Sequence, residues 1–84
     1  MAWRLTVKGS FHVRGRGLIA TGDCVADGEP TRGAVTLHYP DGSEAEGYAA
    51  AFERFAISNW WRHRFGVLLR GMESIPLGTI IDSE

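Results

Sequence analysis

The sequence has few of the residues and patterns that mark several protein classes. Its single cysteine, Cys24, can neither form an internal disulfide nor fill a zinc site by itself. No apolar run approaches the ~18–20 residues of a membrane helix, and residues 1–4 do not begin a secretory signal peptide. We therefore expect a soluble, cytoplasmic protein without a membrane partner. Cys24 is expected to be a small buried residue rather than a reactive thiol.

Patterns that mark catalysis and cofactor binding are also missing. His12, His38 and His63 lie far apart without the spacing of metal ligands, and no Ser–His–carboxylate set is visible. The phosphate-binding loop G-x-x-x-x-G-K-S/T is absent as well. We predict that the protein is not an enzyme, holds no metal or other cofactor, and does not hydrolyse GTP.

The 84 residues suffice for one domain, which we predict to span residues 1–84. Their net charge of −1 excludes a uniformly basic surface, but the charge is unevenly distributed. Segments 1–22 and 54–72 each carry +4, whereas segment 23–53 carries −6. A basic patch therefore forms if the two positive segments meet in space.

Alternating apolar and polar residues predict strands in the first third of the chain. The alternation runs through residues 3–8 and resumes at 11–13, after a bend or bulge at Gly9-Ser10. Gly15 and Gly17 allow a tight turn, after which residues 18–25 form a second strand.

Further strands are expected later in the chain. Residues 34–39 are rich in β-formers and end in a Pro40-Asp41-Gly42 turn. Residues 64–71 are an apolar run bounded by glycine, and residues 79–82 form a short closing strand. Five or six strands with eleven glycines indicate an all-β barrel or sandwich.

Residues 43–57 are ambiguous on local evidence, because their composition slightly favours a helix while a strand with two distinct faces is the competing interpretation. A strand would place one set of side chains on one face: Glu44, Glu46, Tyr48, Phe52 and Arg54. The other face would carry a set of small residues: Ala45, Gly47, Ala49 and Ala51.

Three motifs resemble those of one protein family. Residues 11–22 (FHVRGRGLIATG), 65–72 (FGVLLRGM) and 77–81 (LGTII) are similar, in order and spacing, to segments of the second domain of translational GTPases such as elongation factor Tu. The resemblance implies a closed, six-stranded antiparallel Greek-key β-barrel, and it favours a strand for residues 44–55. It covers nearly the whole chain, without the family's GTP-binding domain.

The resemblance also implies an RNA-binding surface, since that domain contacts the aminoacylated end of tRNA or ribosomal RNA. Arg54 resembles the arginine near the terminal adenosine, and Leu69 and Arg70 match the end of the strand beside the same pocket. The family's acidic residue falls on Ala51 here. Arg14 and Arg16 can join these residues in one patch, or can pair with nearby acids and cover apolar surface.

The basic and aromatic stretch Trp60-Trp61-Arg62-His63-Arg64 allows three interpretations. Its tryptophans and arginines can bind unpaired RNA. They can equally anchor a protein contact, or one tryptophan can plug the barrel while the arginines lie in a solvated loop.

We expect a non-enzymatic binding module that contacts tRNA, ribosomal RNA or a translation-related protein. The alternative is a protein–protein interaction domain, a regulator or inhibitor that imitates a translation-factor surface. The sequence does not decide between an RNA and a protein ligand, and it leaves the oligomeric state open.

Overall fold

The computed structural model describes residues 3–26, 31–56 and 63–83, and folds them into strands without a helix. The strands are β1 (Trp3–Val13), β2 (Gly17–Ala26), β3 (Gly33–His38), β4 (Glu44–Ala56), β5 (His63–Leu69) and β6 (Ile80–Asp82). The ambiguous segment is therefore a strand. These described ranges contain no helix long and apolar enough to cross a membrane.

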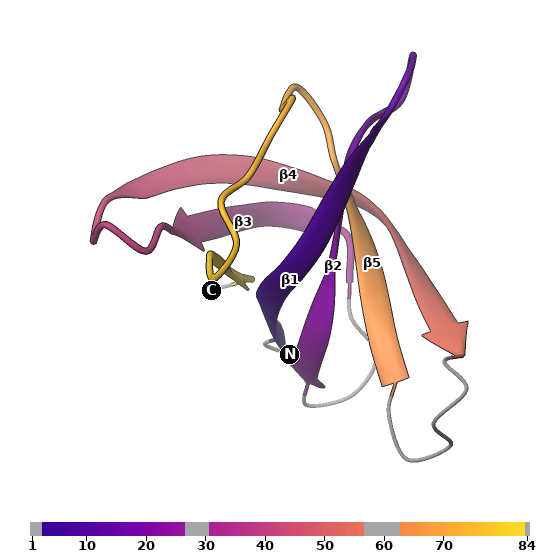
Figure 1. Cartoon of the computed structure of the whole chain (residues 1–84), viewed down its shortest axis with the longest axis horizontal. Helices are drawn as coiled ribbons and strands as arrows, with labels where there is room; N and C mark the ends of the chain where they lie inside the picture. Colours follow the sequence, from indigo (N-terminus) through magenta and orange to yellow (C-terminus); the bar gives the residue numbers. More distant parts are fainter. Residues whose placement is uncertain (1–2, 27–30, 57–62, 84) are drawn as a thin grey trace.

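The six strands close into an antiparallel barrel in the order β1-β2-β5-β4-β3-β6 (Figure 1). Strands β3, β4 and β5 are successive neighbours, and β6 returns to lie beside β3, which is a Greek-key arrangement. The predicted closed six-stranded antiparallel Greek-key barrel is confirmed. Closure satisfies the backbone groups of strands that would otherwise lie at an edge.

The short strand β6 closes the barrel by pairing with both β1 and β3. Ile81 lies opposite Leu5 on one side and Leu37 on the other, and all three side chains are buried. The contact continues beyond β6, because the Val7 amide donates to the carbonyl oxygen of Thr79 at 2.9 Å. A long stretch of β1 is thereby held to the end of the chain.

The interior is filled by apolar side chains from every strand, as the alternation predicts. The buried apolar residues are Trp3, Leu5, Val7, Leu18, Ala20, Val35, Leu37, Ala49, Val67, Leu69, Ile75 and Ile81. Burial of this set supplies the main driving force for folding.

A β-bulge in β1 reverses which side chains face the interior. The register shifts between Val7 and Gly9, directly before and at the first residue of Gly9-Ser10, where the sequence predicted a bend or bulge. Before the bulge the odd-numbered residues are buried, as Leu5 and Val7 show. Beyond it the extra residue changes the alternation, and Phe11 lies on the outer surface with 49% of its area exposed.

A second bulge, between Ala49 and Ala51, does the same in β4. Ala49 is fully buried, whereas Phe52 rather than Ala51 packs against the core beyond the bulge. The expectation that Phe52 shares a face with Tyr48, and Ala51 with Ala49, is therefore wrong. The bulge was not foreseen, and a single extra residue moves every later side chain to the opposite face.

Candidate functional site

An apolar row crosses four neighbouring strands on the outside of the barrel. Phe11 of β1 pairs with Ile19 of β2, Ile19 with Leu68 of β5, and Leu68 with Ala51 of β4. Directly paired residues of antiparallel strands lie on the same face. Because Leu69, next to Leu68, is fully buried, these four side chains face outwards. We call them the outer row.

A surface hollow of about 470 Å³ lies over one end of the outer row, at Leu68 and Ala51. Its lining comes from strands β4 and β5, the residue that follows β5 and the β1–β2 turn: Gly15, Arg16, Ala50, Ala51, Leu68 and Arg70. A smaller adjoining hollow shares Arg16, Ala51 and Leu68 and adds Ile19 and Gly66. We treat the two as one site, the hollow, with an apolar floor and two arginines around it.

Arg16 reaches the hollow because the β1–β2 turn lies against β5. The turn is closed by a hydrogen bond of 3.0 Å from the Arg16 amide to the Val13 carbonyl. Gly17 follows with a φ of 135°, and a Cβ there would lie 2.6 Å from the carbonyl oxygen of Leu69. Only glycine allows this close approach, which brings Arg16 to the end of β5.

Arg70, the residue that follows β5, also lines the hollow. Its amide donates to the carbonyl oxygen of Tyr48 on β4 at 3.4 Å, and Gly71 then turns the chain away with a φ of 77°. Arg70 and Arg16 are both exposed. Among the described residues that line the hollow none is acidic. The site therefore combines positive charge with apolar surface.

The remaining predicted site residues are divided between the surface, the core and the undescribed part of the chain. Arg14 is exposed in the β1–β2 turn but does not line the hollow, and the Leu69 side chain is buried in the core. Arg54 pairs through its backbone with Phe65 rather than with Leu68. The Arg54 side chain lies outside the described part.

The basic and aromatic stretch is described only at its end. His63 and Arg64 are backbone positions of β5, opposite Ala56 and Phe55 of β4. Their side chains lie outside the description, as do Trp60, Trp61 and Arg62 entirely. The three interpretations of this stretch therefore remain predictions.

Sequence reasoning missed Phe11, Ile19 and Leu68 as surface residues. An alternating apolar pattern normally marks the buried face of a strand, and Phe11 continues such a pattern. The one indication was Gly9-Ser10, since a bulge changes the face of whatever follows it. Tyr48 is 49% exposed beside the backbone of Arg70. The strand alternative placed it on one face with Glu44 and Glu46 but did not say which face is the outer one.

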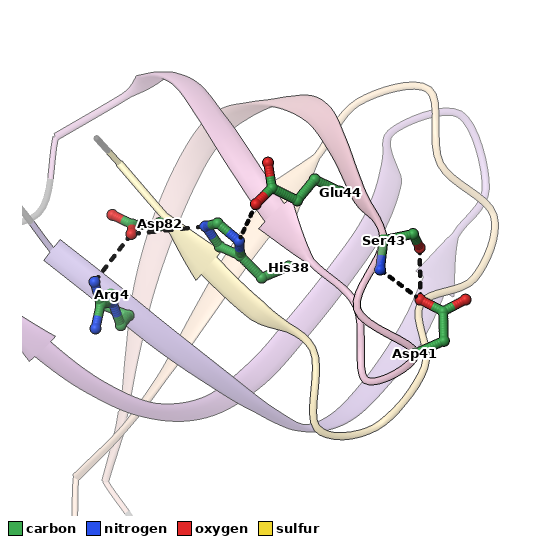
Figure 2. A network of polar contacts seen from close by, with 6 residues as sticks. All are labelled: Arg4, His38, Asp41, Ser43, Glu44 and Asp82. Atoms are coloured by element: carbon green, nitrogen blue, oxygen red, sulfur yellow. Dashed lines mark hydrogen bonds and ion pairs between the residues drawn. The ribbon is translucent and has the colours of Figure 1, made fainter.

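A network of polar side chains lies around β6, where the barrel closes (Figure 2). Arg4 on β1 donates to the Asp82 carboxylate at 3.1 Å, and His38 on β3 lies 3.8 Å from the same oxygen. The other ring nitrogen of His38 lies 3.1 Å from Glu44 of β4. The network connects β1, β3, β4 and β6 where the barrel closes, so it stabilises the fold.

A second hollow, of about 460 Å³, lies at the β3–β4 turn. It is lined by Tyr39, Pro40, Asp41, Ser43, Ser74 and Pro76, without a lysine or arginine among these described residues. Asp41 accepts hydrogen bonds from the Ser43 hydroxyl at 2.6 Å and the Ser43 amide at 2.9 Å (Figure 2). These bonds lower the pKa of Asp41.

The described residues contain no group of three or more His, Cys, Asp or Glu side chains able to hold a metal ion. Cys24 is partly buried against the core, and burial raises the pKa of its thiol. A raised pKa disfavours the nucleophilic thiolate. These features leave the hollow as the candidate functional site.

Comparison of the sequence with protein-family models and with curated proteins gave no match. The fold agrees with the barrel that the motifs imply, but a barrel of this kind can carry many functions. The hollow itself is therefore the feature that points to a function.

Proposed function

We propose that the protein is a non-enzymatic binding module that binds RNA at the hollow between Arg16 and Arg70. The single observation that carries the proposal is the position of these two exposed arginines around an apolar floor formed by Ile19, Ala51 and Leu68. The motif resemblance to translational GTPases adds the class of target, namely a tRNA end or ribosomal RNA.

The chemistry of the hollow suits a nucleotide. A guanidinium group holds a phosphate through paired, charge-assisted hydrogen bonds. The apolar side chains of the outer row offer contact to the face of a base. A volume of about 470 Å³ lies within the range of ~300–1,000 Å³ typical of ligand pockets.

Binding to labelled single-stranded RNA, tRNA and ribosomes, followed by fluorescence anisotropy between about 50 and 200 mM salt, tests the proposal. We expect affinity to fall with salt, since each phosphate contact contributes about −0.7 to the slope of log K against log salt for single strands. Arg16→Ala and Arg70→Ala should each weaken binding and reduce that slope by about 0.7.

Val25→Glu is the matched control, because it lowers the net charge by the same amount as each arginine variant. Val25 is 77% exposed on β2 and lies about 20 Å along the strand from Ile19, at ~3.3 Å per residue. It should retain most of the affinity. Absence of binding to all three RNAs at low salt would contradict the proposal.

A protein ligand at the same surface is the alternative outcome, since arginine and aromatic residues also dominate protein interfaces. Capture of partners from a lysate with and without ribonuclease separates the two. A partner lost after ribonuclease treatment, and lost with Arg16→Ala, supports RNA binding. A partner that survives the nuclease and still requires Arg16 supports a protein ligand instead.

A further inference from the structure

Phe11 extends the apolar floor of the hollow onto β1. It lies directly opposite Ile19, which lines the hollow, and its side chain remains 49% exposed. The end of β1 and the beginning of β2 project from the barrel in Figure 1. Phe11 pairs with Ile19 in this part of the two strands and faces outwards. An aromatic ring is thus exposed one strand away from a site that suits a base.

The projecting segment also carries positive charge. Residues 10–17 contain Arg14 and Arg16 and no acidic residue. Both arginines are exposed. A phosphodiester chain that leaves the hollow past Arg16 therefore meets no acidic residue in this segment, and the two arginines favour a path along β1 and β2.

We infer that Phe11 is a second base-stacking position, so that the hollow and Phe11 together bind two successive nucleotides of an unpaired RNA strand. This inference rests on the proposed function. Neighbouring strands lie ~4.8 Å apart, so Phe11 lies about 5–10 Å from the side chains of Ile19 and Leu68. Stacked bases are only ~3.4 Å apart, so the two bases must be unstacked. A base-paired duplex cannot supply that geometry.

A role of Phe11 in binding must be distinguished from a purely structural role, because an aromatic ring opposite Ile19 also stabilises the pair of strands. Phe11→Leu keeps an apolar side chain of similar size but removes the π-face. Phe11→Trp keeps the π-face. Thermal unfolding of both variants shows that the fold is retained before binding is compared.

The test is a titration of the protein with each of three probes: adenosine monophosphate, the trinucleotide ApApA and a short RNA duplex. Backbone amide shifts in NMR spectra measure the binding. We expect the trinucleotide to bind more tightly than either other probe. Phe11→Leu should lose about tenfold in affinity for the trinucleotide and almost none for the mononucleotide, whereas Phe11→Trp should bind both like the wild type.

Two results would overturn the second position while leaving the proposed function intact. In the first, Phe11→Leu binds the trinucleotide like the wild type although Arg16→Ala is weakened. In the second, Phe11→Leu loses equal affinity for both single-stranded probes, which means that Phe11 only supports the hollow. If the wild type binds neither these probes nor any RNA of greater length, the proposed function itself fails.

Discussion

The ring of Trp3 meets the ring of Phe52 edge to face, with centroids 4.9 Å apart and planes at 88°. Trp3 is only 2% exposed, and its indole nitrogen donates to the carbonyl oxygen of Thr31 at 3.1 Å. One side chain thus connects β1, β4 and the segment that leads into β3. The contact exists because the bulge in β4 turns Phe52 towards the core.

Trp3→Ala should lower the free energy of unfolding by about 3–5 kcal/mol, since it removes a large buried side chain and leaves a cavity. Trp3→Phe should cost less, about 1–3 kcal/mol, because an aromatic ring remains while the hydrogen bond to Thr31 is lost. Urea denaturation measures both. A similar decrease in the free energy of unfolding for the two variants would show that packing of Trp3 on Phe52 contributes little to stability.

Gly22→Ala should destabilise the protein strongly. Gly22 lies opposite Val7 at the bulge in β1, and a Cβ there would overlap the carbonyl oxygen of Thr6. The strands would have to separate, at a cost of about 1–3 kcal/mol or more. The matched control is Gly47→Ala, whose Cβ would meet Val35 at an ordinary 3.5 Å. Equal thermal stability of the two variants would contradict the close approach of β1 and β2.

Asp82→Asn should weaken the closure of the barrel. The Asp82 side chain is 13% exposed and accepts a hydrogen bond from Arg4. Removing its charge should cost about 1–2 kcal/mol, which corresponds to a fall in Tm of roughly 4–16 °C for a domain of this size. Arg4→Gln should cost less than ~1 kcal/mol, because the Arg4 side chain is 62% exposed. A larger loss for Arg4→Gln than for Asp82→Asn would count against this account.

The turn carboxylate of Asp41 should titrate below its ordinary pKa of 3.8, first because of the Ser43 hydroxyl and then because of the Ser43 amide. Since the folded-state pKa is lowered, the stabilising effect is present above pH ~4 and is lost as the pH falls through the folded-state pKa. In Ser43→Ala the pKa should rise towards the ordinary value. NMR titration of the Asp41 carboxyl measures it, and equal midpoints in the two proteins would exclude the hydroxyl as a cause.

The parts of the fold that local chemistry determines could be predicted from the sequence. Gly9 of the predicted Gly9-Ser10 bend borders the bulge of β1, and Gly42 adopts a φ of 92° in the predicted turn after Pro40. The short closing strand ends at Asp82, as expected. In each case one or two residues restrict the backbone directly.

The faces of β4 could not be predicted, because the bulge at Ala49 and Ala51 depends on pairing with β5. The same applies to Phe11, whose outward position follows from the register of β1 against β2. Arg16 and Arg70 were proposed as site residues from the motifs, but the apolar row between them was not. That row exists only after two bulges have reversed two strands.

The most direct test of the account is a map of backbone amide shifts in NMR spectra of the protein titrated with a short single-stranded RNA. We predict that the largest shifts occur at Arg16, Ile19, Leu68 and Arg70. They should disappear in the Arg16→Ala, Arg70→Ala double variant while the spectrum remains that of a folded protein. Shifts confined to the second hollow, at Tyr39, Asp41 and Ser74, would contradict the account.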